Sequence, residues 1–239
     1  MLETSRDTEQ PRNAKDIAMG EIVQLVISHR YAPGDRILET ALSEELKMSR
    51  TPVREALSSL ESTGFLEKVK NQKGYQVPFL TADDMKQVFH ARAILESDTA
   101  YFAAQCITDS EIEYLENINR IEKAAYNNKD RGTYSDANER FHMNLVGIAG
   151  NPYVARYTRE LYWRSSLYNF FFASFYSFGP IQGHKDRLAS SEHQAIINAF
   201  KEHDGENASL LMREHIMSTY RSMTGPDISL LLPKFIAYG

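Results

Sequence analysis

The 239-residue chain is poor in the residues that mark several common classes of protein. It has one cysteine, Cys106, which excludes an internal disulfide and is typical of a reducing cytosol. Its place in an alanine-rich helical stretch predicts a core residue. With 12 glycines and 8 prolines, the chain is not of low complexity. The most apolar stretch, residues 168–178, is too short to span a bilayer, and the polar first residues contain no secretory signal. We expect a folded, cytoplasmic protein that does not enter a membrane.

The net charge of −5 is unevenly distributed along the chain. Residues 15–78 contain nine basic and nine acidic side chains, whereas residues 79–239 contain 16 basic and 20 acidic ones. The basic side chains of the first region form two groups, Lys47, Arg50 and Arg54, and Lys68, Lys70 and Lys73. A neutral region with two basic edges can bind phosphate locally, while the acidic remainder stays away from nucleic acid.

Short helical patterns and turn signals alternate in the first region. Ser49 is suited to cap a helix, Pro52 is tolerated in its first turn, and Gly64 suits the left-handed position after its last turn. A Pro-Gly turn at 33–34 separates the first predicted helix from the second. Three helices followed by a β-hairpin predict a winged helix-turn-helix. The predicted helices are 14–29, 38–46 and 49–63, and the predicted strands are 65–70 and 75–77.

From Thr81 onward the apolar residues recur at helical spacing, and no strand is predicted. The fold class is therefore mainly α, with an N-terminal winged helix-turn-helix and a C-terminal all-α helical bundle. The predicted helices of the bundle are 82–105, 109–127, 133–149, 152–176, 187–203 and 205–222. The predicted organisation is a disordered N-terminal tail (1–14), a DNA-binding domain (15–78), a linker (79–81), a helical domain (82–222) and a C-terminal tail (223–239).

The segment from Met48 to Leu57 carries the clearest chemistry in the chain. Arg50, Thr51 and Arg54 share one side of the predicted helix, while apolar residues can hold its other side against a small core. Arginine is the usual bidentate reader of guanine in the major groove. Two arginines four apart are, on their own, more often a solvated helix face than a DNA reader.

The order of motifs over residues 15–78 resembles the GntR superfamily of bacterial transcription regulators. The matching segments are Pro33-Gly-Asp-Arg-Ile-Leu38, Leu42-Ser-Glu-Glu-Leu46, Ser49-Arg-Thr-Pro-Val-Arg-Glu-Ala-Leu57 and Lys73-Gly74. The resemblance implies that the recognition helix enters the major groove of double-stranded DNA, that the wing tip lies against the minor groove, and that Arg36 approaches the backbone. The implied DNA-binding residues are Arg36, Ser49, Arg50, Thr51, Arg54, Lys73 and Gly74. Because one such domain reads few base pairs, a homodimer on a palindromic operator is expected.

Three of the seven histidines, His142, His193 and His215, lie on apolar stripes of their predicted helices. Asn138 lies one turn before His142 and shares its face. Three imidazoles and an oxygen ligand from different helices can hold a divalent metal inside a bundle. Each histidine is also compatible with a hydrogen-bonded place in the core.

Residues 82–222 resemble the FCD ligand-binding domain found in one GntR branch. The resemblance rests on Arg92-Ala-Ile-Leu-Glu96, Phe141-His142, Gly150-Asn-Pro152 and the 22-residue spacing from His193 to His215. It implies a divalent metal of the zinc, nickel or manganese type, held by Asn138, His142, His193 and His215. Asn138 departs from the usual aspartate, which implies weaker metal binding or open positions that favour an anionic effector. Arg92 is the candidate second anion contact, unless it pairs with Glu96.

These features predict a regulator, specifically a repressor, whose DNA binding responds to a small organic acid near the metal. A metal-free regulator with the histidines in an effector pocket is the main alternative. A metal-dependent hydrolase is disfavoured, because no acidic residue has a recognisable general-base spacing such as HExxH. The aromatic segment 168–178 is compatible with the effector cavity, the bundle core or a dimer surface.

Overall fold

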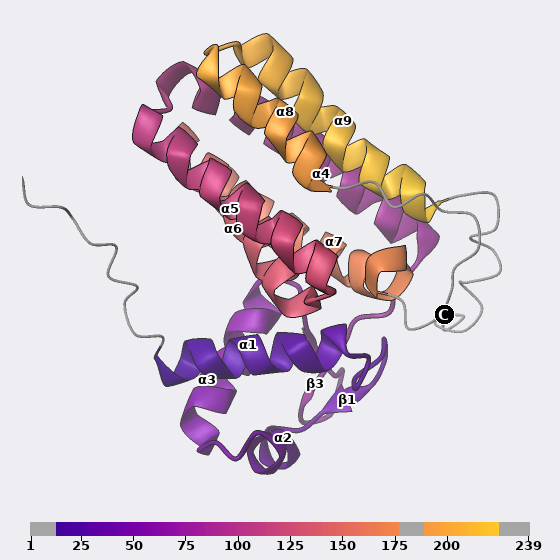
Figure 1. Ribbon diagram of the computed structural model, residues 1–239. Helices are drawn as coiled ribbons and strands as arrows, with labels where there is room; N and C mark the ends of the chain where they lie inside the picture. Colours follow the sequence, from indigo (N-terminus) through magenta and orange to yellow (C-terminus); the bar gives the residue numbers. More distant parts are fainter. Residues whose placement is uncertain (1–12, 177–188, 225–239) are drawn as a thin grey trace, which may run out of the picture.

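The computed structural model describes residues 13–176 and 189–224, which form a small winged-helix region and a larger helical bundle (Figure 1). The first region contains α1 (Ala14–Ile27), β1 (Arg36–Ile37), α2 (Glu39–Leu46), α3 (Arg50–Ser62), β2 (Glu67–Lys68) and β3 (Tyr75–Gln76). The bundle contains α4 (Ala82–Cys106), α5 (Asp109–Asn128), α6 (Arg131–Ala149), α7 (Pro152–Phe172), the 3₁₀ turn η1 (Ser174–Tyr176), α8 (Ala189–Lys201) and α9 (Gly205–Met223). The predicted fold class is confirmed.

The winged-helix region packs three helices against a three-stranded antiparallel sheet of order β1-β3-β2. The hairpin β2–β3 was predicted, but its strands are shorter than expected. Strand β1, which pairs Arg36 with Gln76, was not predicted, because two residues leave no visible alternation. Val53, Leu57 and Leu60 are fully buried and hold α3 in this core. Ser49 takes the N-cap backbone conformation of α3 without a capping side-chain hydrogen bond, contrary to expectation.

Local signals along the sequence set the ends of the bundle helices. Thr108 and Glu111 form a capping box at the start of α5. Asn151 caps α7, whose first residue is Pro152, just after Gly150 ends α6 in the left-handed conformation. Helix α7 ends at Phe172, where the prediction continued to residue 176. Cys106 is exposed, not buried as predicted, because it is the last residue of α4.

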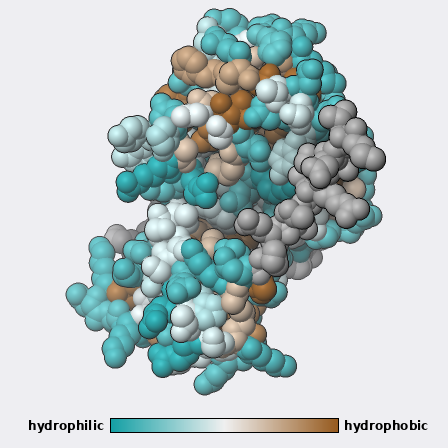
Figure 2. Space-filling view, turned by 90° about the vertical axis from the view of Figure 1, so that its left-hand side faces the viewer, coloured by the Kyte–Doolittle hydropathy of each residue, from teal (hydrophilic) through white to brown (hydrophobic). Residues whose placement is uncertain are grey.

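Helix α7 joins the bundle to the winged-helix region. Its Trp163 and Phe170 rings lie edge-on to Phe65, at centroid distances of 5.2 and 6.3 Å. The His29 side chain, just after α1, donates from Nε2 to the Phe170 carbonyl at 2.7 Å. Arg164 donates to Asp84 of α4 at 2.8 Å and to the Phe79 carbonyl at 3.0 Å, and so ties the segment between the regions to α7. The face in Figure 2 is mostly hydrophilic, with scattered apolar patches.

Candidate functional site

The proposed DNA-reading side chains all lie in the winged-helix region and are accessible. Ser49, Arg50, Thr51 and Arg54 are exposed along the first turns of α3, as are Arg36 and Lys73 near the wing. Arg50 Nε donates to Glu39 Oε1 at 3.0 Å, which holds the guanidinium at the start of the helix. Arg36 Nε donates to the Lys73 carbonyl at 2.9 Å and ties β1 to the wing tip.

The bundle brings His142 of α6, His193 of α8 and His215 of α9 together in its interior. All three side chains are buried, and the nitrogen atoms that they offer lie within 4.8 Å of one another. His215 Nε2 is 3.2 Å from His193 Nε2 and 3.4 Å from His142 Nε2. Metal–nitrogen bonds of about 2.1 Å in a tetrahedral site place neighbouring nitrogens roughly 3.4 Å apart. The two separations therefore fit a bound divalent metal.

A glutamate holds the other nitrogen of each imidazole. The Nδ1 atom of His142 bonds to Glu96 at 2.5 Å, that of His193 to Glu122 at 2.8 Å, and that of His215 to Glu192 at 2.8 Å. Such carboxylate partners orient a metal-binding imidazole, fix the tautomer with Nε2 as ligand atom and increase its basicity. These carboxylates also supply the negative charge that Asn138 does not.

The protonation states suggested by the surroundings suit metal binding. Burial lowers the pKa of His142 to about 3, although Glu96 opposes this shift. Burial and the nearby His193 lower the pKa of His215. Burial alone would raise the pKa of Glu96, but Arg92 and His142 outweigh it and lower that pKa. Neutral imidazoles beside ionised carboxylates are the forms that a divalent cation requires.

Asn138 and Arg92 both lie beside the histidines, but each already has protein partners. Asn138 donates to Glu122 at 2.9 Å, and its Oδ1 accepts from Tyr162 at 3.0 Å. Arg92 is buried and forms an ion pair with Glu96 at 2.6 Å, the pairing raised as an alternative from the sequence, and it also donates to Ser165. A carbonyl oxygen has two lone pairs, so Asn138 Oδ1 retains an acceptor position.

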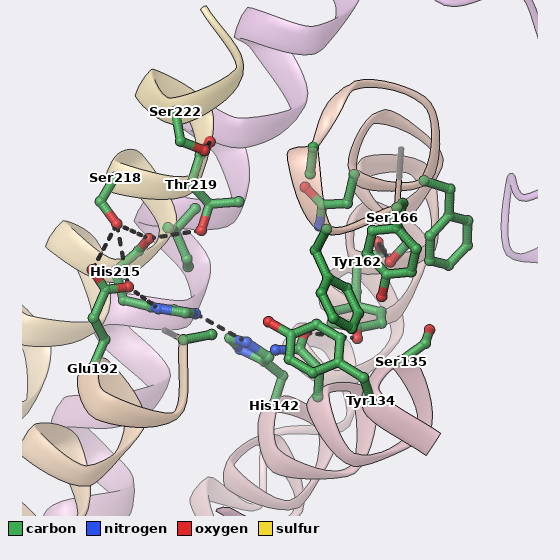
Figure 3. Close-up of a pocket in the computed structure, with 18 of the residues that line it drawn as sticks. Tyr134, Ser135, His142, Tyr162, Ser166, Glu192, His215, Ser218, Thr219 and Ser222 are labelled. Carbon is green, nitrogen blue, oxygen red and sulfur yellow. Dashed lines mark hydrogen bonds and ion pairs between the residues drawn. The ribbon is translucent and has the colours of Figure 1, made fainter. Parts of the chain in front are cut away.

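A cavity of about 110 Å³ opens beside His142 and His215 (Figure 3). This is smaller than the roughly 300–1,000 Å³ of drug-sized sites and suits a small molecule. Burial raises the pKa of the Tyr134 and Tyr162 hydroxyls, which remain neutral donors there. Polar lining groups include Arg92, Ser135, Asn138, Ser166, Asn169, Ser218, Thr219 and Ser222. The predicted aromatic segment contributes Phe170, Phe172, Phe175 and Tyr176, while 177–178 lie outside the described residues.

The three glutamates were not assigned to the site from the sequence. Glu122 gave a signal, because it lies four residues after Ile118 and so places an acid on the buried side of α5. Glu96 was noticed only as a partner for Arg92. Glu192 gave no such signal, because it is only half-buried and lies outside the apolar stripe of α8.

A winged helix with an exposed arginine-bearing helix, joined to a helical bundle with a buried polar site, is the architecture of a two-domain DNA-binding regulator. Residues 15–77 match the family of bacterial regulatory proteins named gntR, and residues 87–218 match the FCD domain. The chain belongs to the GntR family and carries an FCD domain, and it is a transcriptional regulator, not an enzyme. Among the described residues, no helix combines the length and apolar character needed to cross a bilayer.

Known proteins of this family resemble the chain over different lengths. It is 34% identical over 137 residues to the Nta operon transcriptional regulator of Aminobacter aminovorans, a match that spans 57% of this chain and 64% of that relative. It is 25% identical over 224 residues to the HTH-type transcriptional repressor RspR of Escherichia coli (strain K12), 93% of each chain. The structure of E. coli McbR/YncC superposes with a TM-score of 0.70 at 19% identity, covering 95% of this chain and all of that one. That structural similarity shows that the two chains share a fold.

Proposed function

We propose that this regulator is a metal-dependent repressor that responds to a small carboxylate effector. The observation that carries the proposal is the convergence of three carboxylate-anchored histidines beside a small polar cavity. His142, His193 and His215 would hold a divalent metal of the zinc, nickel or manganese type, with Asn138 Oδ1 as a further ligand. The metal would supply a positive charge that attracts a carboxylate, and Arg92 would provide the second anion contact.

On the DNA side, Arg50, Thr51 and Arg54 would read bases in the major groove. Ser49 and Arg36 would contact the backbone, and Lys73 with Gly74 would place the wing against the minor groove. A homodimer would present two such regions to a palindromic operator on the bacterial chromosome, in the cytoplasm. A repressor role is supported by similarity to a relative whose name describes a repressor.

Metal content tests the proposal directly. Purified protein, stripped with a chelator, would be reloaded with zinc, nickel or manganese and measured by elemental analysis. We expect one metal per chain, and a loss of at least tenfold in metal affinity for His193→Ala. His90→Ala provides a matched control, because His90 is exposed on α4. Equal metal content in His193→Ala and wild type would show that this site is wrong.

A metal-free effector pocket is the second candidate. It is favoured by the contact of 3.2 Å between the Nε2 atoms of His193 and His215, since without a metal a ring protonated on both nitrogens can donate from Nε2 to the other ring and from Nδ1 to its glutamate. In that case wild-type protein would take up no stoichiometric metal, while small carboxylates would still change its DNA affinity.

A further inference from the structure

A second hollow lies between the winged-helix region and the bundle. It is a cleft of about 590 Å³, within the range of sites for small organic molecules. Helices α1 and α6, whose labels can be followed in Figure 1, supply its two walls, and Trp163 of α7 completes it. Ser135 borders both this cleft and the histidine cavity.

One wall of the cleft is largely apolar. Met19, Val23 and Ile27 lie one helical turn apart on α1 and face the cleft together with the buried Trp163 ring. Gly20 also lines it, and a Cβ atom added there would meet no atom within 4 Å. The cleft is thus open at the centre of α1. An apolar surface of this kind favours a ligand with an apolar or aromatic body.

The charged groups of the cleft are all acidic. Asp16, Asp130, Asp136 and Glu139 line it, and the described lining residues include no lysine or arginine. Three of the four have partners within the protein: Asp130 caps α6 through Thr133, and Asp136 lies 3.8 Å from Arg140 outside the lining. Glu139 accepts a hydrogen bond from Trp163 and is near Arg159. An anion would therefore be repelled by the lining, and a cation attracted.

We propose that this cleft is a second ligand site that binds an organic cation, namely a protonated amine on an aromatic or apolar body. The ammonium group would lie near Asp16 and Asp136, and the body would contact Val23, Met19 and the Trp163 ring. Aromatic rings also attract cations directly. The walls of the cleft belong to the winged-helix region and to the bundle. A bound amine therefore favours the relative arrangement of α1 and α6 that is seen in this structure. The site is separate in place and in charge preference from the proposed acid site.

The chain offers a built-in probe for this site, because Trp163 is its only tryptophan. We would titrate phenethylamine at neutral pH and follow the emission of Trp163, with 3-phenylpropionate as a probe of similar size and opposite charge. We expect a saturable change with the amine and at least tenfold weaker binding of the acid. Equal responses to the two probes would overturn the proposal.

Substitutions locate the binding in the cleft. Gly20→Leu should fill the open space and abolish the response to the amine, whereas Gly20→Ala should retain it. Asp136→Asn should weaken amine binding at least fivefold, compared with Asp98→Asn on exposed α4 surface. If Gly20→Leu does not fold, as judged by circular dichroism, Asp136→Asn decides the question. Unchanged amine affinity in Asp136→Asn, or in a folded Gly20→Leu variant, contradicts the site. His193→Ala should bind the amine normally, which separates this site from the histidine site.

Discussion

The winged-helix region and the helical bundle carry their candidate functional side chains in opposite ways. In the first region, Arg50, Thr51 and Arg54 lie within one helix and are exposed. In the bundle, the candidate histidine ligands come from three different helices, and they are buried. The first site therefore depends on local helix geometry, whereas the second exists only when the whole core is assembled.

The energetic consequences differ accordingly. An exposed arginine interacts with water when DNA is absent, so its loss affects binding and leaves stability almost unchanged. A buried histidine–glutamate pair has no water to replace a missing partner, so its loss affects both stability and binding. Substitutions in the two regions should consequently separate into two classes, and four of them test this difference.

Glu122→Ala should give the largest effect. The Glu122 carboxylate is completely buried and accepts from His193 Nδ1 and from Asn138. Its removal leaves two buried donors without an acceptor, which costs about 1–3 kcal/mol for each donor. Urea unfolding would measure this loss, with the exposed Glu113→Ala on the same helix as the control. If the two variants have equal free energies of unfolding, the Glu122 carboxylate does not stabilise the core.

Glu139→Gln should change the pH dependence of stability. Burial and the nearby Asp136 raise the pKa of Glu139 to about 7, from 4.5. As the pH rises above 4.5, the unfolded carboxyl ionises first, so wild-type stability falls until about pH 7 and is then constant. A shift of this size corresponds to roughly 3 kcal/mol at most. Glutamine does not ionise, so Glu139→Gln should be more stable than wild type at pH 8 and similar to it at pH 4.5.

Urea unfolding of Glu139→Gln and wild type at several pH values would measure this difference in pH dependence. The exposed Glu202→Gln serves as the control, with no comparable gain expected. A constant difference between Glu139→Gln and wild type at all pH values would contradict a titrating Glu139.

The same difference between the regions explains what the sequence could predict. Helix α3 and the wing were predictable because local spacing, Gly64 and Gly74 define them. The three histidines were predictable as buried residues from their apolar stripes. Their glutamate partners were not predictable, because a pair such as His142 and Glu96 joins two residues that are 46 positions apart and lie on different helices. The cleft between α1 and α6 depends on how the two regions pack, for which sequence periodicity carries no information.

Arg54→Ala should have a smaller effect in free energy, but one confined to DNA recognition. The side chain is exposed, so we expect an unchanged melting temperature. A good arginine–guanine contact contributes roughly 1–3 kcal/mol of discrimination, so specific binding should fall by about 10- to 100-fold per subunit. Fluorescence anisotropy with an operator selected in vitro and with scrambled DNA measures this. Arg120→Ala, which removes one charge from the exposed surface of α5, is the control. Retained sequence preference in Arg54→Ala would show that α3 is not the reading helix.

Gly74→Ala should give the smallest effect, and it separates positioning from reading within the winged-helix region. Gly74 has a φ of 109°, and a Cβ atom there would lie 2.8 Å from the backbone oxygen of Ile37. The wing must shift, at a cost of about 1–2 kcal/mol. Gly64→Ala is the matched control, since Gly64 also has positive φ but no atom within 4 Å of an added Cβ.

If Lys73 contacts phosphate, displacing the wing weakens binding to all DNA sequences alike, and the salt dependence of the affinity decreases by about one counterion. Arg54→Ala, by contrast, should lower the preference for the operator over scrambled DNA. A loss of preference in Gly74→Ala would mean that the wing reads bases, and the division between a reading helix and a positioning wing would not hold. Metal binding should be unchanged in both variants, because neither residue belongs to the bundle.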